Sequence, residues 1–129
     1  MAERVLIIDD DKWIAMSTSM VLEAEGFEVL SSTSGARGLD LAVETRPAVI
    51  LLDIMMPGVD GWSTLEMLKA HKVTADIPVI VFTARDCHKG RSVSLKRGAA
   101  EFFRKPFRPE TLVKTIRRHL DLRAASKPA

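Results

Sequence analysis

The chain has 129 residues, of which 47% are hydrophobic and 28% are charged, and its formal net charge is +2. This length and balance favour one globular domain with its own core, and so small a net charge gives no argument for nucleic acid as a partner. The single Cys87 excludes an internal disulfide and a multi-cysteine metal site. We find no signal-peptide pattern and no apolar run near the ~18 residues of a membrane span, so we expect a cytoplasmic protein with no membrane partner.

Short apolar runs alternate with segments of helical periodicity along the chain. The apolar runs predict five strands, at residues 4–8, 27–31, 48–52, 77–82 and 100–103. The periodic segments predict four helices between them, at residues 12–25, 34–46, 61–72 and 87–98. The pattern is weakest in the fourth helix, because Gly90 lies inside it.

A fifth helix is predicted to begin at Pro109, with Leu112, Ile116 and Leu120 on its inner face. We expect one domain over residues 1–122, followed by a flexible tail or the start of a linker at residues 123–129. Because strands and helices alternate, the chain predicts a parallel sheet covered by helices on both faces, which is a three-layer α/β/α fold.

Polar side chains stand where the predicted strands end. Asp9 and Asp10 follow the first strand, Asp53 follows the third and Thr83 follows the fourth, while Lys105 comes soon after the fifth. In a parallel sheet all of these ends lie at one edge, where open α/β sheets bind their ligands. We therefore expect these side chains to converge on one site.

The chemistry of that set points to phosphoryl transfer on Asp53. Crowded carboxylates resist ionising together unless a cation offsets their charge, and ligands that are all oxygen select a hard ion such as Mg²⁺ (Mn²⁺ is an alternative). Lys105 adds a fixed positive charge and Thr83 adds a hydroxyl donor, both suited to phosphoryl oxygens. No general base stands out, and a carboxylate nucleophile needs none.

Each residue also has an ordinary structural explanation when it is taken alone. Asp9, Asp10 or Asp11 could cap the first helix, and Asp53 could be a turn residue before Pro57. The Thr83 hydroxyl could satisfy backbone at a strand end, and Lys105 could be an ordinary solvated lysine. The joint pattern, in which all of them stand at strand ends in a consistent order, favours the site.

These residues resemble the receiver domain of bacterial two-component signalling, of the chemotaxis response-regulator type, over about residues 3–122. The motifs that carry the resemblance follow four of the strands: Asp9-Asp10, Asp53 with Met56-Pro57-Gly58 and Asp60-Gly61, Thr83-Ala84, and Lys105-Pro106-Phe107. The resemblance implies the flavodoxin-like strand order 2-1-3-4-5. It further implies a phosphoprotein that is a signalling switch and not an enzyme, apart from catalysing its own phosphorylation and dephosphorylation.

The resemblance assigns roles to single positions. Asp53 would be the phosphoacceptor, and Mg²⁺ would be bound by Asp10, Asp53 and the backbone carbonyl of Met55, with Asp9 acting through water. Thr83 and Lys105 would contact the phosphoryl group. Thr83 and Phe102 would form the conformational switch, and Phe102 could act only through burial because it has no hydroxyl.

Two further positions are implied to tune the lifetime of the phosphoryl group. Met55 lies two residues past the phosphoacceptor and Arg85 lies two residues past Thr83. A bulky Met and a long Arg are expected to shield the acyl phosphate and slow its hydrolysis. Trp13, near the start of the first helix, is expected either to dock the donor protein or to pack in a partly buried position, and His71, His88 and His119 are expected at the surface.

The resemblance implies that a histidine kinase or a histidine phosphotransfer protein is the donor, and that a downstream protein or a fused output domain receives the signal. The face expected to change is formed by the fourth helix, the fifth strand and the fifth helix. Residues 85–108 contain eight Lys or Arg and two acids, Asp86 and Glu101. This bias fits a solvated surface, an acidic protein partner, or a phosphorylation-linked dimer, and direct binding of nucleic acid is not expected because no recognition motif is present.

Two other functions stay open from the residues. The first is an aspartate-nucleophile phosphohydrolase, which typically needs a second acid two residues past the nucleophile, where this chain has Met55. The second is a degenerate receiver that signals without phosphate, which the intact set of Asp10, Asp53, Thr83 and Lys105 disfavours.

Overall fold

The structure is a computed structural model, and it describes residues 3–54, 61–83, 90–105 and 107–126. Its centre is a single parallel sheet in the order β2-β1-β3-β4-β5. The strands are β1 (Arg4–Ile8), β2 (Glu28–Ser32), β3 (Val49–Asp53), β4 (Val79–Thr83) and β5 (Glu101–Arg104). This arrangement confirms the predicted three-layer α/β/α fold and its strand order.

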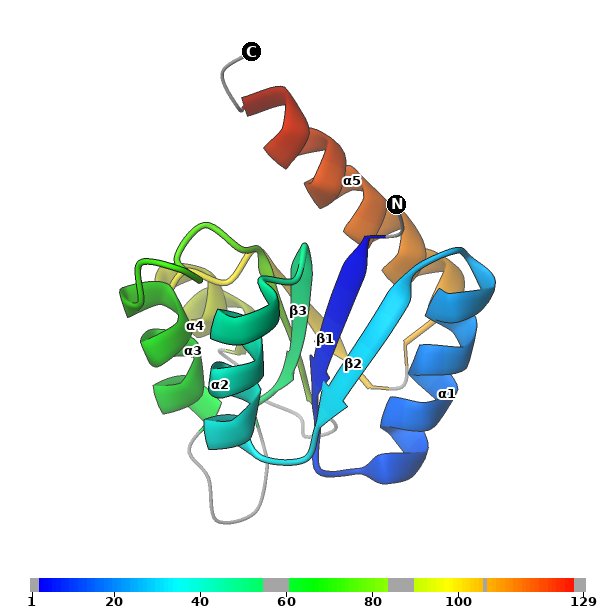
Figure 1. The fold of residues 1–129 in the computed structure, drawn as a ribbon, viewed down its shortest axis with the longest axis horizontal. Coiled ribbons are helices and arrows are strands. Elements are labelled where there is room, and N and C mark those ends of the chain that lie inside the picture. The colour runs from blue at the N-terminus through cyan, green and yellow to red at the C-terminus, as the bar shows by residue number, and fades with distance from the viewer. Residues whose placement is uncertain (1–2, 55–60, 84–89, 106, 127–129) are drawn as a thin grey trace.

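Five helices cover the two faces of the sheet, with α1 and α5 on one side and α2, α3 and α4 on the other (Figure 1). They are α1 (Lys12–Ala24), α2 (Gly35–Thr45), α3 (Gly61–Ala70), α4 (Gly90–Lys96) and α5 (Pro109–Ser126). The helix α5 continues past the domain boundary expected at residue 122, and its last turns project beyond the sheet (Figure 1). The start predicted for the fourth helix, residue 87, lies outside the described residues. Of the helices described, none is both long enough and apolar enough to span a membrane.

The strands β3 and β4 are buried along their whole length, which explains their unbroken apolar sequence. Their side chains alternate between two cores. Ile50 and Leu52 face α2 and α3, while Val49 and Leu51 face α1 and α5. Each such side chain stabilises the fold by about 1.5–3 kcal/mol when it leaves water. The two cores therefore hold β3 firmly, and with it the carboxylate at its end.

The N-terminal caps of α1 and α2 do not use the carboxylates of Asp9 and Asp10. The carboxylate of Asp11 caps α1, since its Oδ1 accepts hydrogen bonds from the backbone N–H groups of Trp13 and Ile14 at 3.0 and 3.2 Å. The helix α2 is capped in the same way by Ser34, whose Oγ accepts a hydrogen bond from the N–H of Arg37 at 3.4 Å. Capping of α1 is thus done by Asp11, and neither Asp9 nor Asp10 is its N-cap.

Candidate functional site: a carboxylate cluster at the sheet edge

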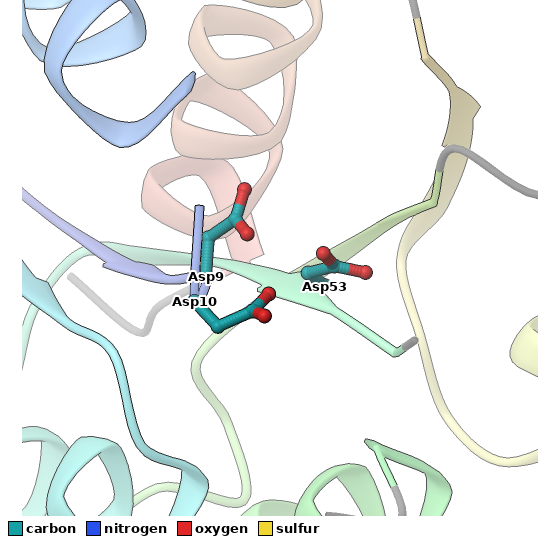
Figure 2. Close-up of side chains that lie close together, drawn as sticks. All are labelled: Asp9, Asp10 and Asp53. Atoms are coloured by element: carbon teal, nitrogen blue, oxygen red, sulfur yellow. The ribbon is translucent and has the colours of Figure 1, made fainter. Parts of the chain in front are cut away.

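Parallel pairing brings the ends of β1 and β3 to the same edge of the sheet. Ile8 is the register partner of Leu52, so the next residues of the two strands, Asp9 and Asp53, meet at the edge. The N–H of Asp9 also donates to Ser32 O of β2 at 3.0 Å, which extends the β1–β2 ladder to the same edge. Figure 2 shows the side chains of Asp9, Asp10 and Asp53 around a common space.

The three aspartates offer carboxylate oxygens that all lie within 4.8 Å of one another. Asp9 is fully buried and Asp53 is 5% exposed, whereas Asp10 is exposed to solvent. Asp9 is held by a hydrogen bond from the backbone N–H of Asp11 to its Oδ1 at 3.0 Å. Two of the three carboxylates are thus buried, and the third is exposed to solvent.

Lys105 supplies the positive charge of the cluster. Its Nζ lies 3.0 Å from Asp9 Oδ2 and 3.2 Å from Asp53 Oδ2, and its side chain is 9% exposed. Its backbone N–H donates to Thr83 O at 2.8 Å, which extends the β4–β5 ladder to the sheet edge. The structure therefore brings Lys105 and Thr83 to the same edge as the aspartates. The sequence placed Lys105 here for a phosphoryl oxygen, but it gave no sign of the contact with Asp9.

Burial raises the pKa of Asp9 to about 6, from its ordinary value of 3.8. The hydrogen bond from Asp11, the hydrogen bond from Lys105 and the charge of Lys105 all act in the opposite direction, and the charge of Asp53 adds to the rise. Desolvation is the largest of these effects. Asp9 therefore holds its proton more tightly than an ordinary carboxyl group does.

The donor set fits Mg²⁺. All three candidate ligands are carboxylate oxygens, and their mutual distances let one ion reach them. Three ionised aspartates and one lysine carry a formal charge of −2, which a divalent cation neutralises. The fourth predicted ligand, the carbonyl of Met55, lies outside the described residues, as does Arg85, which was expected to tune the lifetime of the phosphoryl group.

The two residues predicted to form the switch are both buried. Thr83 is fully buried at the end of β4, and Phe102 is 7% exposed in the core between the sheet and α2 and α3. Phe102 is the register partner of Val81, two residues before Thr83. The burial of Phe102 is compatible with a role through packing, and the switch formed by Thr83 and Phe102 stays a prediction.

The exposed side of α1 carries three large apolar side chains, one of which is Trp13. Trp13 is 79% exposed, so the alternative of a partly buried packing role is wrong. Met16 and Met20 follow it at helical spacing and are 55% and 66% exposed. Beside this surface, α1 and α5 enclose a groove of about 510 Å³ that leads to Lys105, lined in part by Ile14, Val21, Phe107 and Leu112.

A second charged cluster was not predicted. Glu101 of β5 accepts a hydrogen bond from Arg118 at 2.7 Å, lies 3.1 Å from His119 and forms an ion pair with Arg91 at 3.7 Å. His119 was expected at the surface, yet its side chain is only 16% exposed. A single charge in the sequence does not show which elements it will join, and here Glu101 joins α4, β5 and α5.

The fold and the cluster of three aspartates with Lys105 together define a known class of signalling domain. The family model of the response regulator receiver domain matches residues 5–117, and the chain belongs to this family. Receiver domains are signalling domains, and response regulators receive phosphoryl groups from kinases.

Two curated relatives and one solved structure illustrate the similarity. The chain is 38% identical over 114 residues to the DNA-binding dual master transcriptional regulator RpaA of Synechocystis, covering 88% of this chain and 47% of RpaA. It is 36% identical over 113 residues to the protein PilH of Pseudomonas aeruginosa, covering 88% of this chain and 93% of PilH. It thus spans about half the length of RpaA and nearly all of PilH. A CheY-like receiver domain from Methanospirillum hungatei has a TM-score of 0.89 and 32% identity, covering 98% of this chain and all of that one (100%).

Proposed function

We propose that this chain is a phosphorylation-controlled switch whose Asp53 accepts a phosphoryl group in a Mg²⁺-dependent reaction. One observation supports the proposal above all others. A nearly buried carboxylate stands at the end of a central strand, within reach of two further carboxylates and 3.2 Å from a lysine ammonium. A group of this kind combines a nucleophile with a metal site and a cation for phosphoryl oxygens.

The residues divide the chemistry among them. An oxygen of Asp53 attacks the phosphorus of a donor phosphohistidine, the P–N bond breaks, and the leaving imidazole takes up a proton. Lys105 moves its ammonium from the Asp53 carboxylate to a phosphoryl oxygen, and the Thr83 hydroxyl donates to another. Asp10, Asp53 and the Met55 carbonyl would hold the ion, and Asp9 would assist through water. The ion, when bound, neutralises the charge that gathers on the transferring group.

The donor would be a histidine kinase or a histidine phosphotransfer protein that docks beside the site. The apolar surface of Trp13, Met16 and Met20 and the neighbouring α1–α5 groove both lie on the helix that starts next to Asp10. Exposed aromatic side chains often dominate the energy of such contacts. Trp13 is therefore the docking residue that we propose.

The signal would leave through the face formed by α4, β5 and α5. A phosphoryl group that draws Thr83 toward it would free space beside the buried end of β4, and the packing of Phe102 would respond. Such a modification shifts the populations of two states only by the difference in its stabilisation of each. Glu101 ties the three elements of this face together, so a change in one can reach the others. The receiver of the signal would be a downstream protein or a fused output domain, in the cytoplasm.

The test is phosphorylation by acetyl phosphate and Mg²⁺, followed by intact mass measurement. The wild type should gain the mass of one phosphoryl group, and Asp53→Asn should gain none. Asp40→Asn, which changes an exposed aspartate of α2, is the matched control and should behave as the wild type. Chelation of Mg²⁺ should abolish the adduct. An adduct on Asp53→Asn, or none on the wild type, would contradict the proposal.

A further inference from the structure

The path of the Lys105 side chain crosses an aromatic ring. Lys105 follows β5, whereas its two carboxylate partners lie at the ends of β1 and β3, so the side chain must pass over β4, which lies between. At this point β4 carries Phe82, the register partner of Asp53. The Nζ of Lys105 lies 4.7 Å from the centroid of the Phe82 ring. Within the part of the chain that the structure describes, two carboxylates and one ring therefore contact the ammonium.

We infer that Phe82 is a positioning residue for Lys105, which it holds at the phosphoacceptor through a cation–π contact. This inference rests on the proposed role of Lys105 in phosphoryl transfer. The geometry is within the range in which a ring face attracts an ammonium, and the attraction is greatest when water is excluded. Phe82 is 3% exposed and the Lys105 side chain is 9% exposed, so water is largely excluded here.

A ring suits this position better than a polar partner would. The ammonium has three N–H donors, and a phosphoryl group needs them for its oxygens. The face of the ring attracts the charge without a lone pair that would bind a donor in competition. An aliphatic side chain of similar size would fill the space but would not attract the charge. Phe82 can thus keep Lys105 over the site while its donors pass from carboxylate to phosphoryl oxygen.

The ring itself is held in place from the groove side. Phe107 meets Phe82 edge to face, with centroids 5.8 Å apart and an interplanar angle of 80°. Phe103 packs on Phe107 with centroids 6.0 Å apart. Edge-to-face pairs of this kind have a preferred geometry, so the cluster fixes the plane of the Phe82 ring. Phe107 also lines the α1–α5 groove, which places this support next to the proposed docking surface.

The test replaces Phe82 by Leu and, separately, by phenylalanines with one and three ring fluorines. Fluorination weakens the attraction of the ring face and nearly preserves its shape, so these variants keep the fold even where Phe82→Leu does not. The matched controls are the same replacements at Phe103, which packs in the same aromatic cluster without the lysine contact. Two quantities are measured: the rate of phosphorylation by acetyl phosphate, and the proton chemical shift of the Lys105 ε-methylene in the unphosphorylated protein.

We expect Phe82→Leu to slow phosphorylation by roughly threefold to tenfold, the range that one cation–π contact supports. The rate should fall stepwise with fluorine number at position 82 and stay constant at position 103. The ε-methylene shift should move downfield in Phe82→Leu, because the ring that shields it is gone. Unchanged rates along the fluorine series, an unchanged shift, or equal effects at position 103 would overturn the inference. The shift needs no phosphorylation, so a wild type that gains no phosphoryl group would contradict the proposed function alone.

Discussion

Lys105 donates a hydrogen bond to Asp9 at 3.0 Å, across 96 positions of the chain. The same ammonium also contacts Asp53 at 3.2 Å. One lysine thus partly neutralises two of the three carboxylates that are candidate ligands of a divalent cation. Lys105 and Mg²⁺ therefore act on the same charges, and removing either should make the other more important to the fold.

Replacing Lys105 by Met tests this relation. Breaking a buried ion pair from one side usually costs about 3–5 kcal/mol, and the slight exposure of Lys105 places our expectation at about 3 kcal/mol for the metal-free protein at neutral pH. Millimolar Mg²⁺ should restore more stability to this variant than to the wild type, because it binds only the folded protein. The measurement is urea unfolding with and without Mg²⁺.

Lys12→Met is the matched control for this experiment. Lys12 lies at the start of α1 near Asp9, but its side chain is exposed. Exposed charges contribute about 0–1 kcal/mol, so this variant should stay close to the wild type in both buffers. Equal losses in the two variants, or no gain from Mg²⁺ in Lys105→Met, would show that the ammonium does not neutralise the cluster.

The raised pKa of Asp9 predicts a pH dependence of stability. Between pH 3.8, the ordinary pKa of the group, and about pH 6, the folded protein keeps a proton on Asp9 that the unfolded chain has released. Asp9 therefore contributes most to stability below pH 4, and this contribution is lost as the pH rises to about 6. The loss amounts to about 3 kcal/mol in metal-free buffer.

The measurement is the free energy of unfolding of the wild type minus that of Asp9→Asn, from pH 4 to pH 7. This difference isolates Asp9 from the other carboxylates, and we expect it to fall as the pH rises from 4 to about 6 and then to level off. Mg²⁺ favours the ionised carboxylates, so adding it should flatten the fall. A difference that rises with pH in metal-free buffer would mean that the lysine, and not burial, dominates the pKa of Asp9.

Most of the fold was predictable because burial leaves a direct pattern in the sequence. The run before Asp53 is continuously apolar since β3 is covered on both faces, and Leu112 and Ile116 mark the inner side of α5 by their spacing. The candidate site followed from one geometric rule, that parallel strands end at one edge. Asp53 and Lys105 were placed together by that rule, without knowledge of any side-chain contact.

The parts that were missed all depend on how side chains cross between elements. The sequence does not show that Lys105 passes over Phe82, because that path depends on the strand order and on rotamers. His119 is partly buried beside Glu101 of β5, at 3.1 Å, and this contact could not be predicted from either residue alone. The length of α5 was underestimated because the inner apolar pattern ends at Leu120, whereas the helix continues as an overhang whose Leu122 is 58% exposed.

The end of α2 offers a test of backbone strain. Arg46 caps this helix with φ at 47°, and Pro47 after it disfavours continuation of the helix. A non-glycine residue in this left-handed region reduces stability by about 1–2 kcal/mol. Gly removes this strain, but its greater conformational freedom in the unfolded chain offsets part of the gain in stability. Arg46→Gly should therefore raise the free energy of unfolding by roughly 0.5–1 kcal/mol, measured in urea.

Glu44→Gly provides the comparison for that variant. Glu44 is exposed inside α2, where Gly should cost about 1 kcal/mol of stability. If the two variants changed the free energy of unfolding in opposite directions, the effect at Arg46 would come from backbone conformation and not from the loss of a side chain. Destabilisation by both would rule out strain at Arg46.

Gly61, at the start of α3, lies against the backbone of Ile54, the residue after the proposed phosphoacceptor Asp53. A Cβ atom at this position would overlap the Cα and the carbonyl group of Ile54, and these backbone atoms cannot yield as a flexible side chain can. Gly61→Ala should therefore displace Ile54 and the adjacent Asp53, with a loss of about 2–3 kcal/mol in stability. The affinity for Mg²⁺, measured by calorimetry, should fall with it.

Gly26→Ala is the control that replaces a glycine without creating a steric clash. A Cβ atom at Gly26 would meet nothing within 4 Å, but φ is +95°, so strain alone should cost about 1 kcal/mol. Because Gly26 lies at the other end of α1 from Asp10, its variant should keep the wild-type affinity for Mg²⁺. If Gly61→Ala also kept that affinity, the contact with Ile54 would have no part in placing Asp53.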